Sequence, residues 1–144
     1  MLGYARNENI KVVNSYAVKG SRSINYGTQV DSIAFVNGAV TFLLKENPDG
    51  AIWGQDVGND LFPIFSGTLK NSIADRYSVT FHTFDGDTTN YYDTYVAGLI
   101  TALPKGTSKD NLIFGGWYKD AEFTGENDTV ISSKTTGDLE YWAS

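Results

Sequence analysis

The chain has 144 residues, a net charge of −6 at pH 7 and no cysteine, and 14% of its residues are aromatic. The negative charge argues against a nucleic-acid partner, because phosphate binding needs clustered Lys and Arg. The lack of cysteine excludes disulfides, thiolate metal sites and cysteine nucleophiles. No apolar run reaches the ~18 residues of a membrane span, so we expect no membrane insertion.

The N-terminal segment, residues 1–27, is polar and contains short apolar runs at 10–13 and 16–18, which favour two short strands. It lacks the basic, apolar and small-residue order of a signal peptide. We expect the chain to be a piece of a longer exported protein whose export signal and anchor lie outside it.

An amphipathic helix is predicted at residues 31–46, because apolar side chains recur there at spacings of three and four. Asp31 or Ser32 can cap its start by accepting a bond from a free N–H. Gly38 lies inside it and should cost up to ~1 kcal/mol relative to Ala, which leaves a kink or two short helices open. The turn residues 47–50 end the helix. The apolar stripe consists of Ile33, Val36, Val40, Leu43 and Leu44.

Two short strands are predicted next, at residues 52–55 and 61–65. Pro63 cannot donate to a strand ladder, so the second strand should lie at a sheet edge or begin there. Residues 66–76 carry little apolar content and mixed charge. This composition predicts a domain boundary near Ile73.

The predicted organisation is a small β/α module over residues 1–72, followed by a second small module over residues 73–144. We expect the helix stripe to pack on the strands that carry Trp53 and Phe65, and not on the second module. The two halves could nevertheless form one rigid unit, because the first half has few strands with which to cover its helix.

The second half begins with a clean alternation at residues 77–82, which places Tyr77, Val79 and Phe81 on one face of a strand. Residues 91–103 have no single period, so a strand and a short helix both remain open there. Further strands are expected at residues 112–118, 130–131 and 139–143.

One motif in this half is distinctive, the order Phe-Gly-Gly-Trp-Tyr-Lys-Asp at residues 114–120. Together with Tyr-Ser-Val-Thr-Phe at 77–81, Phe-Thr-Gly at 123–125 and the closing segment 136–143, it resembles the Listeria–Bacteroides repeat, also called the internalin B-repeat family. Asp85-Gly86-Asp87 departs from the family's Asn-Gly-Gly. Trp142 stands where the family has Tyr.

Residues 12–67 are similar, more weakly, to segments that close GLUG-type repeat regions of bacterial surface proteins. The two resemblances imply an α+β fold whose C-terminal module is β-grasp-like, a small sheet with one short helix. They also imply a non-catalytic module of a bacterial cell-surface or secreted protein, acting as a spacer, stalk or adhesion unit. Its partners would be neighbouring modules of the same polypeptide and an unknown protein or glycan ligand.

Catalytic motifs are absent from the sequence. His82 is the only histidine and lies on the polar face of its strand by alternation, so we favour a solvent-facing residue over a catalytic or zinc-binding one. The carboxylate pairs lie in turn-rich loops, where Asp is favoured for backbone bonding, so a small glycoside hydrolase is a remote alternative. The stretch 85–90 begins like a calcium loop but lacks the EF-hand Gly and Glu, which leaves only a non-EF site open. We therefore expect no enzyme, no metal and no cofactor.

The candidate ligand-binding residues are aromatic, since exposed Tyr and Trp rings stack on sugars. They are Tyr91, Tyr92, Tyr95 and Trp117. A carbohydrate-binding module is accordingly the main alternative function. The competing interpretation is that a small module without cysteine fills its core with rings, which we favour for Trp117 and leave open for the tyrosines.

Overall fold

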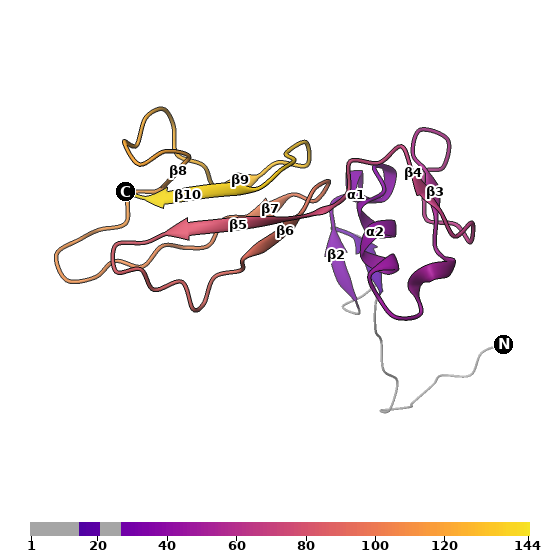
Figure 1. The fold of residues 1–144 in the computed structure, drawn as a ribbon, viewed down its shortest axis with the longest axis horizontal. Helices are drawn as coiled ribbons and strands as arrows, with labels where there is room; N and C mark the ends of the chain where they lie inside the picture. Colours follow the sequence, from indigo (N-terminus) through magenta and orange to yellow (C-terminus); the bar gives the residue numbers. More distant parts are fainter. Residues whose placement is uncertain (1–14, 21–26) are drawn as a thin grey trace, which may run out of the picture.

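The computed structural model describes residues 15–20 and 27–144, and its two halves lie end to end along the long axis of the molecule (Figure 1). The strand predicted at 10–13 lies outside the described residues, whereas the one at 16–18 is present as β1. The elements of the first half are β1 (Tyr16–Val18), β2 (Thr28–Val30), α1 (Ile33–Val36), α2 (Ala39–Lys45), the 3-10 helix η1 (Gly50–Ile52), β3 (Gln55–Asp56) and β4 (Leu69–Lys70).

The predicted helix is divided into α1 and α2 at Gly38, whose φ of 88° is in the left-handed region. The Oδ1 of Asn37 accepts a hydrogen bond of 3.0 Å from the Ala39 N–H and so satisfies one of the free N–H groups at the start of the second helix. Ser32 occupies the N-cap position of α1, but its side chain makes no capping hydrogen bond. Of the alternatives left open by the sequence, two short helices is the correct one.

This break changes which side chains face inward. Ile33 and Val36 are 41% and 38% exposed, whereas Ala34, Ala39 and Val40 are buried. The helical core also includes Val30, and the partly buried Tyr16, Phe35, Leu44, Ala74 and Leu99 pack against it. Leu99 and Ala74 lie beyond the predicted boundary, so the expectation that the helix avoids the second module is wrong. Small residues at the helix surface permit that close approach.

The strands predicted at 52–55 and 61–65 are largely replaced by other structure. β3 pairs in parallel with β4, and the segment around Pro63 contributes only an isolated bridge between Gly54 and Ile64. The reason is the buried amide of Gln55. Its Nε2 donates to the carbonyls of Phe35 and Asp60 at 2.7 and 3.0 Å, and its Oε1 accepts from the Thr41 hydroxyl at 2.6 Å.

The second half is built on one mixed sheet with the strand order β6-β5-β10-β8. β10 runs parallel to β5, and both β6 and β8 are antiparallel to their neighbours. β7 and β9 form a separate antiparallel pair. The bounds are β5 (Arg76–His82), β6 (Thr94–Val96), β7 (Thr101–Ala102), β8 (Trp117–Tyr118), β9 (Val130–Ile131) and β10 (Leu139–Ala143).

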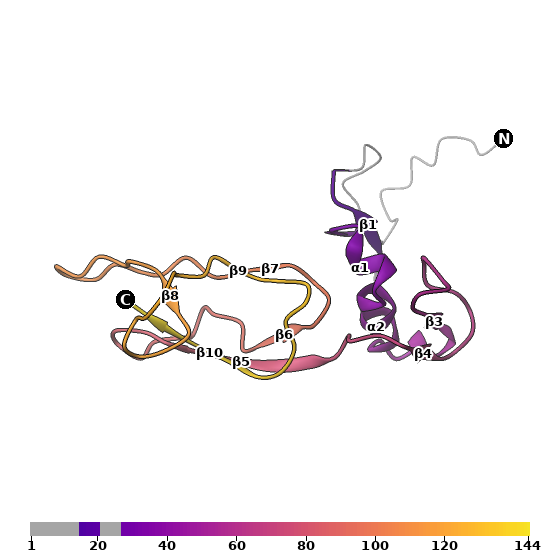
Figure 2. The ribbon, with the colours of Figure 1, turned by 90° about the horizontal axis from the view of Figure 1, so that it is seen from above.

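The core of this half lies between the sheet and the long connections that carry β7 and β9, as Figure 2 shows. It consists of Val79, Phe81, Tyr95, Leu103, Trp117, Ile131, Tyr141 and Ala143. The predicted alternation of β5 is confirmed. The described residues form a mixed structure, rich in strands and with few helices, which is compatible with the α+β class. Residues 73–144 contain no helix, so the short helix implied for this module is absent. The strand predicted at 112–118 is reduced to Trp117–Tyr118.

The two halves contact each other through both polar and apolar groups. The Arg76 guanidinium donates to both carboxylate oxygens of Glu46, at 2.6 and 2.8 Å. The Asn37 amide donates to the Gly98 carbonyl at 2.9 Å, and the Ser72 hydroxyl donates to the Asn37 carbonyl at 2.6 Å. A boundary near Ile73 therefore stays a prediction, since the segments on either side of it share contacts.

Candidate functional site

Two of the four candidate rings are core residues. Tyr95 and Trp117 are 3% and 2% exposed. The Tyr95 hydroxyl donates to the Gly137 carbonyl at 2.5 Å, and the Trp117 Nε1 donates to the Pro104 carbonyl at 2.8 Å. Because their ring faces and polar atoms are occupied internally, neither presents a platform to a ligand. Of the four candidates, only Tyr91 and Tyr92 remain as possible ligand-binding rings.

Tyr91 and Tyr92 are half-buried, and each packs edge-on against Phe81 with ring centroids 5.4 Å apart. The Tyr92 hydroxyl donates to the Ala102 carbonyl at 2.7 Å. Burial raises the pKa of Tyr92 to about 12, so its hydroxyl remains a protonated donor across the physiological range. The structure thus brings two of the predicted residues together at one edge of the sheet.

A groove of about 380 Å³ lies beside these tyrosines. It lies at the start of β6, where the chain joins the edge of β5. The Val79 N–H of β5 donates there to the Asp93 carbonyl at 2.8 Å. Its lining combines ring edges with hydroxyl groups and one exposed carboxylate. The lining residues are Val79, Thr80, Phe81, Thr88, Thr89, Tyr91, Tyr92 and Asp93. Such a mixture of rings and hydrogen-bonding groups is typical of sites that orient small polar ligands.

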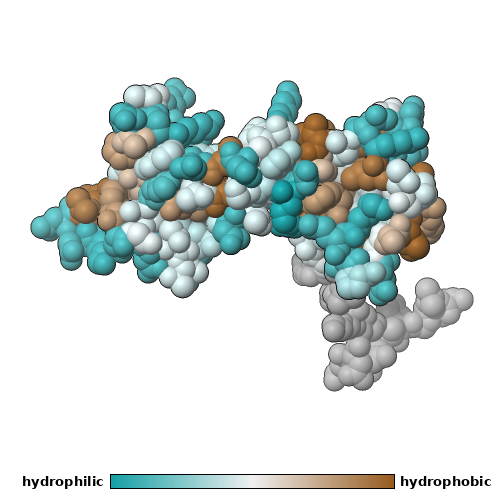
Figure 3. All heavy atoms as spheres, in the orientation of Figure 1, coloured by the Kyte–Doolittle hydropathy of each residue, from teal (hydrophilic) through white to brown (hydrophobic). Residues whose placement is uncertain are grey.

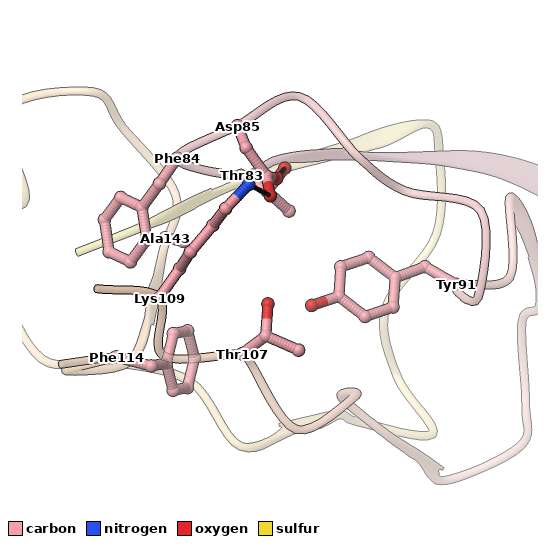
Figure 4. A pocket seen from close by; sticks show the side chains of 8 residues that line it. All are labelled: Thr83, Phe84, Asp85, Tyr91, Thr107, Lys109, Phe114 and Ala143. Atoms are coloured by element: carbon pink, nitrogen blue, oxygen red, sulfur yellow. Dashed lines mark hydrogen bonds and ion pairs between the residues drawn. The ribbon is translucent and has the colours of Figure 1, made fainter. Parts of the chain in front are cut away.

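On its other side, Tyr91 borders a smaller hollow, in which the Thr107 and Tyr91 hydroxyls point toward each other (Figure 4). The Lys109 Nζ pairs with Asp85 Oδ2 at 3.2 Å across one side of it. Its volume of about 10 Å³ is that of a single water. This hollow is too small for a ligand larger than water.

A second large pocket, of about 410 Å³, lies against Trp117. Phe114 forms one wall, and Asn127 closes another by donating from its Nδ2 to the Gly115 carbonyl at 3.0 Å. Gly116 has a φ of 142°, and a Cβ there would come within 2.4 Å of Asn127. The second glycine of the motif is thus favoured by both its backbone conformation and this loop packing.

The loop carboxylates are tied into their own turns. Hydrogen bonds from the side chains of Asn59 and Asn71 lower the pKa of Asp56. The backbone N–H of Asp87 lowers the pKa of Asp85, and the Thr89 side chain lowers that of Asp87. A glycosidase general acid needs a raised pKa. These carboxylates therefore have the opposite electrostatic environment from catalytic acids.

Asp120 follows the same pattern, because the Thr124 hydroxyl donates to its Oδ2 at 2.6 Å and lowers its pKa. Within residues 15–20 and 27–144, no group of three or more His, Asp or Glu side chains is arranged to hold a metal ion. No helix in this part of the chain is long and apolar enough to cross a membrane.

The sequence prediction missed a second set of rings, on the opposite face of the sheet. Phe81 and Tyr141 point into the core, so His82 and Trp142 point outward, and their rings stack with centroids 4.6 Å apart. The alternation of buried and exposed residues along β5 already indicated that His82 points outward. For Trp142 the signal was its position next to the buried Tyr141.

The C-terminal half is thus a small mixed sheet with a core of aromatic rings. Residues 77–143 match the family model of the Listeria-Bacteroides repeat domain, a little under half of the chain. The C-terminal half therefore contains a Listeria-Bacteroides repeat, and the resemblance seen in its motif is confirmed. This bacterial repeat domain is often found in surface proteins and is generally non-catalytic. No curated protein and no solved structure matches the chain. The GLUG-type resemblance of residues 12–67 stays a prediction.

Proposed function

We propose that this chain is a non-catalytic module of a bacterial cell-surface or secreted protein, located outside the cell and acting as a spacer or adhesion unit. The match of residues 77–143 to a repeat family often found in surface proteins carries this proposal. Its partners are neighbouring modules of the same polypeptide and a protein or glycan ligand. The parallel pair β5 and β10, flanked by β6 and β8, supports a reduced β-grasp-like sheet.

The junction between the halves supports the spacer role. A spacer holds a fixed distance only if its units do not bend against each other. Here the Arg76–Glu46 pair, the Asn37–Gly98 hydrogen bond and the packing of Leu99 on the helices act at separate points of one junction. Several contacts at different points restrain bending in more than one direction.

The distance between two spin labels tests this role, and the absence of cysteine makes labelling specific. The double variant Asp49→Cys and Glu126→Cys places one label on an exposed residue of each half. The spacer role predicts one narrow distance distribution in double electron–electron resonance. A broad or two-component distribution in the folded variant would contradict a rigid spacer.

A second candidate function is carbohydrate binding in the groove beside Tyr91 and Tyr92, favoured by its hydroxyl-rich lining. A glycan array probed with the wild type and with Asp93→Asn tests it. Asp93 lines the groove and is exposed, so its replacement leaves the core intact. Binding that is lost in Asp93→Asn locates the ligand in the groove. Silence across the array, with a cooperative melt, leaves the spacer and protein-adhesion roles.

A further inference from the structure

The outer face of the C-terminal sheet carries a row of rings. His82 on β5 stacks on Trp142 of β10 with an interplanar angle of 12°. Tyr118 of β8 is the direct cross-strand neighbour of Trp142. Phe123 packs against Tyr118 edge-on, with centroids 5.6 Å apart. We call His82, Trp142, Tyr118 and Phe123 the outer ring row.

Solvent reaches this row in the described residues, since His82 is exposed and Trp142 and Tyr118 are half-buried. Figure 2 shows the connections that carry β7 and β9 on one side of β5 and β10, and no element over the other side. Phe123 is 44% exposed, and the side chains of Ser78 and Thr80 on the same face of β5 are exposed. The solvent face of an antiparallel or mixed sheet is normally polar. Rings that span three neighbouring strands on that face indicate an interaction surface.

The charges around the outer ring row are negative. The Glu140 carboxylate lies 3.0 Å from His82 Nε2, and its side chain is 57% exposed. Asp120 follows Tyr118 closely, and its pKa is lowered by the hydrogen bond from Thr124, so it is ionised at neutral pH. Glu122, next to Phe123, is exposed.

Two cations of this half, Lys119 and Arg76, are paired with other carboxylates. The Lys119 Nζ lies 3.2 Å from Asp128, and the Arg76 guanidinium binds Glu46. The row therefore combines indole and phenol rings with carboxylates that can attract a cation. Trp and Tyr rings bind ammonium and guanidinium groups through their electron-rich faces. The chain's net charge of −6 also attracts cations at long range.

We propose that the outer face of β5, β10 and β8 binds a cationic peptide segment of a partner protein. Lys or Arg side chains of the partner lie over Trp142 and Tyr118 and pair with Glu140. A neutral sugar is a poorer fit, because it gains no charge attraction from the carboxylates around the rings. None of the four rings of the outer ring row lines the tyrosine groove, so the proposal does not depend on carbohydrate binding there.

The test is a titration of the whole chain with two synthetic peptides, followed by two-dimensional amide NMR. One peptide carries four Arg residues spaced by Gly and Ser, and the other carries Glu at the same positions. The Arg peptide is expected to bind, to shift amides of β5, β10 and β8, and to bind more weakly as salt rises. The Glu peptide is expected to shift none of them.

Two variants locate the site. Glu140→Gln removes an exposed charge without changing shape, and Tyr118→Leu removes one ring of the row. Each is expected to weaken binding of the Arg peptide about two- to fivefold, as expected for one exposed contact. Asp93→Asn removes another exposed charge, at the tyrosine groove, and is the matched control, with unchanged affinity expected.

Three results would overturn the proposal. The folded wild type does not bind the Arg peptide; both peptides bind equally; or Asp93→Asn weakens binding as much as Glu140→Gln does. A neutral oligosaccharide that shifts amides of the outer ring row, while the Arg peptide does not, would assign the face to glycans instead. An amide spectrum with wild-type dispersion for each variant shows that it has folded.

Discussion

The two halves of the molecule solve the problem of a small core in different ways. The C-terminal half buries large rings, with Phe81 in contact with Trp117 and Tyr141 at centroid distances of 4.8 and 5.9 Å. The N-terminal half buries small residues such as Ala34 and Ala39, and leaves Phe62 and Phe65 59% and 76% exposed. Figure 3 shows apolar residues on the surface of that half. Because apolar burial is the main source of stability, the C-terminal half should be the more stable one.

This difference also explains the junction. Leu99 and Ala74, which follow the first half in sequence, pack against the helical core. Gly98 permits this approach, since a Cβ there would lie 3.0 Å from the Ala39 methyl group. The N-terminal half therefore depends on the C-terminal half for part of its core.

The largest expected effect comes from Trp117→Ala, which removes the central ring of the C-terminal core and its hydrogen bond to Pro104. We expect a loss of about 3–5 kcal/mol in the free energy of unfolding. Urea denaturation followed by circular dichroism measures it. Trp53→Ala, in the other half, serves as the comparison. An equal or larger loss in Trp53→Ala would reverse the assignment of the stable half.

Gly38→Ala should have the next largest effect and acts on the N-terminal half. It combines a positive φ with a Cβ that would lie 2.6 Å from Ser72 Oγ at the junction. We expect a loss of roughly 2–4 kcal/mol from backbone strain and overpacking. Gly86→Ala is the matched control, because Gly86 has a φ of 73° but open space around its Cβ. The control should lose only about 1–2 kcal/mol. Equal losses in thermal melts of the two variants would show that close packing at the junction does not contribute to the effect of Gly38→Ala.

Alkaline pH should destabilise the ring core of the C-terminal half. Burial raises the pKa of Tyr92 and of Tyr141 to about 12, above the value of about 10 for an exposed tyrosine. A raised pKa stabilises the fold below the unfolded value, and this contribution is lost as pH rises toward the folded value. Stability should therefore fall between pH 10 and about 12. Urea midpoints across this range measure the fall, and Tyr92→Phe should reduce it. A midpoint that does not change with pH would contradict the burial of these hydroxyls.

The smallest expected effect is that of the Arg76–Glu46 pair, because about 40% and 35% of these side chains remain exposed. Glu46→Gln should cost no more than about 1 kcal/mol. The Arg76 hydrogen bond lowers the pKa of Glu46, so this stabilisation is present above the unfolded pKa and is lost as pH falls through the folded one. Thermal melts at neutral and acidic pH should differ less for Glu46→Gln than for the wild type. A larger acid sensitivity in the variant would contradict this assignment.

The features predicted correctly from sequence depend on local patterns. The alternation of Tyr77, Val79 and Phe81 is a property of consecutive residues, and so is the disruption of a helix by Gly38. The ring-filled core was likewise expected from Trp117 within its glycine-containing motif. In these cases the physical cause lies within a few residues of its effect.

The features that sequence did not predict depend on distant segments. The parallel pairing of Leu139 with Val79 joins strands that no local pattern connects. The segment around Pro63 has strand-like composition, yet Gln55 takes the hydrogen bonds that fix this region. The outer ring row was missed for the same reason, because Trp142 and His82 become neighbours only when β10 joins β5.

Hydrogen–deuterium exchange of the whole chain tests most directly whether the N-terminal half depends on the C-terminal core. In the wild type, amides of β5 and β10 should be better protected than those of α1 and α2. In Trp117→Ala, protection should fall in both halves together, because Leu99 and Ala74 no longer support the helices. Helices that keep their wild-type protection while the C-terminal sheet exchanges freely would contradict this dependence and show that the halves are independent.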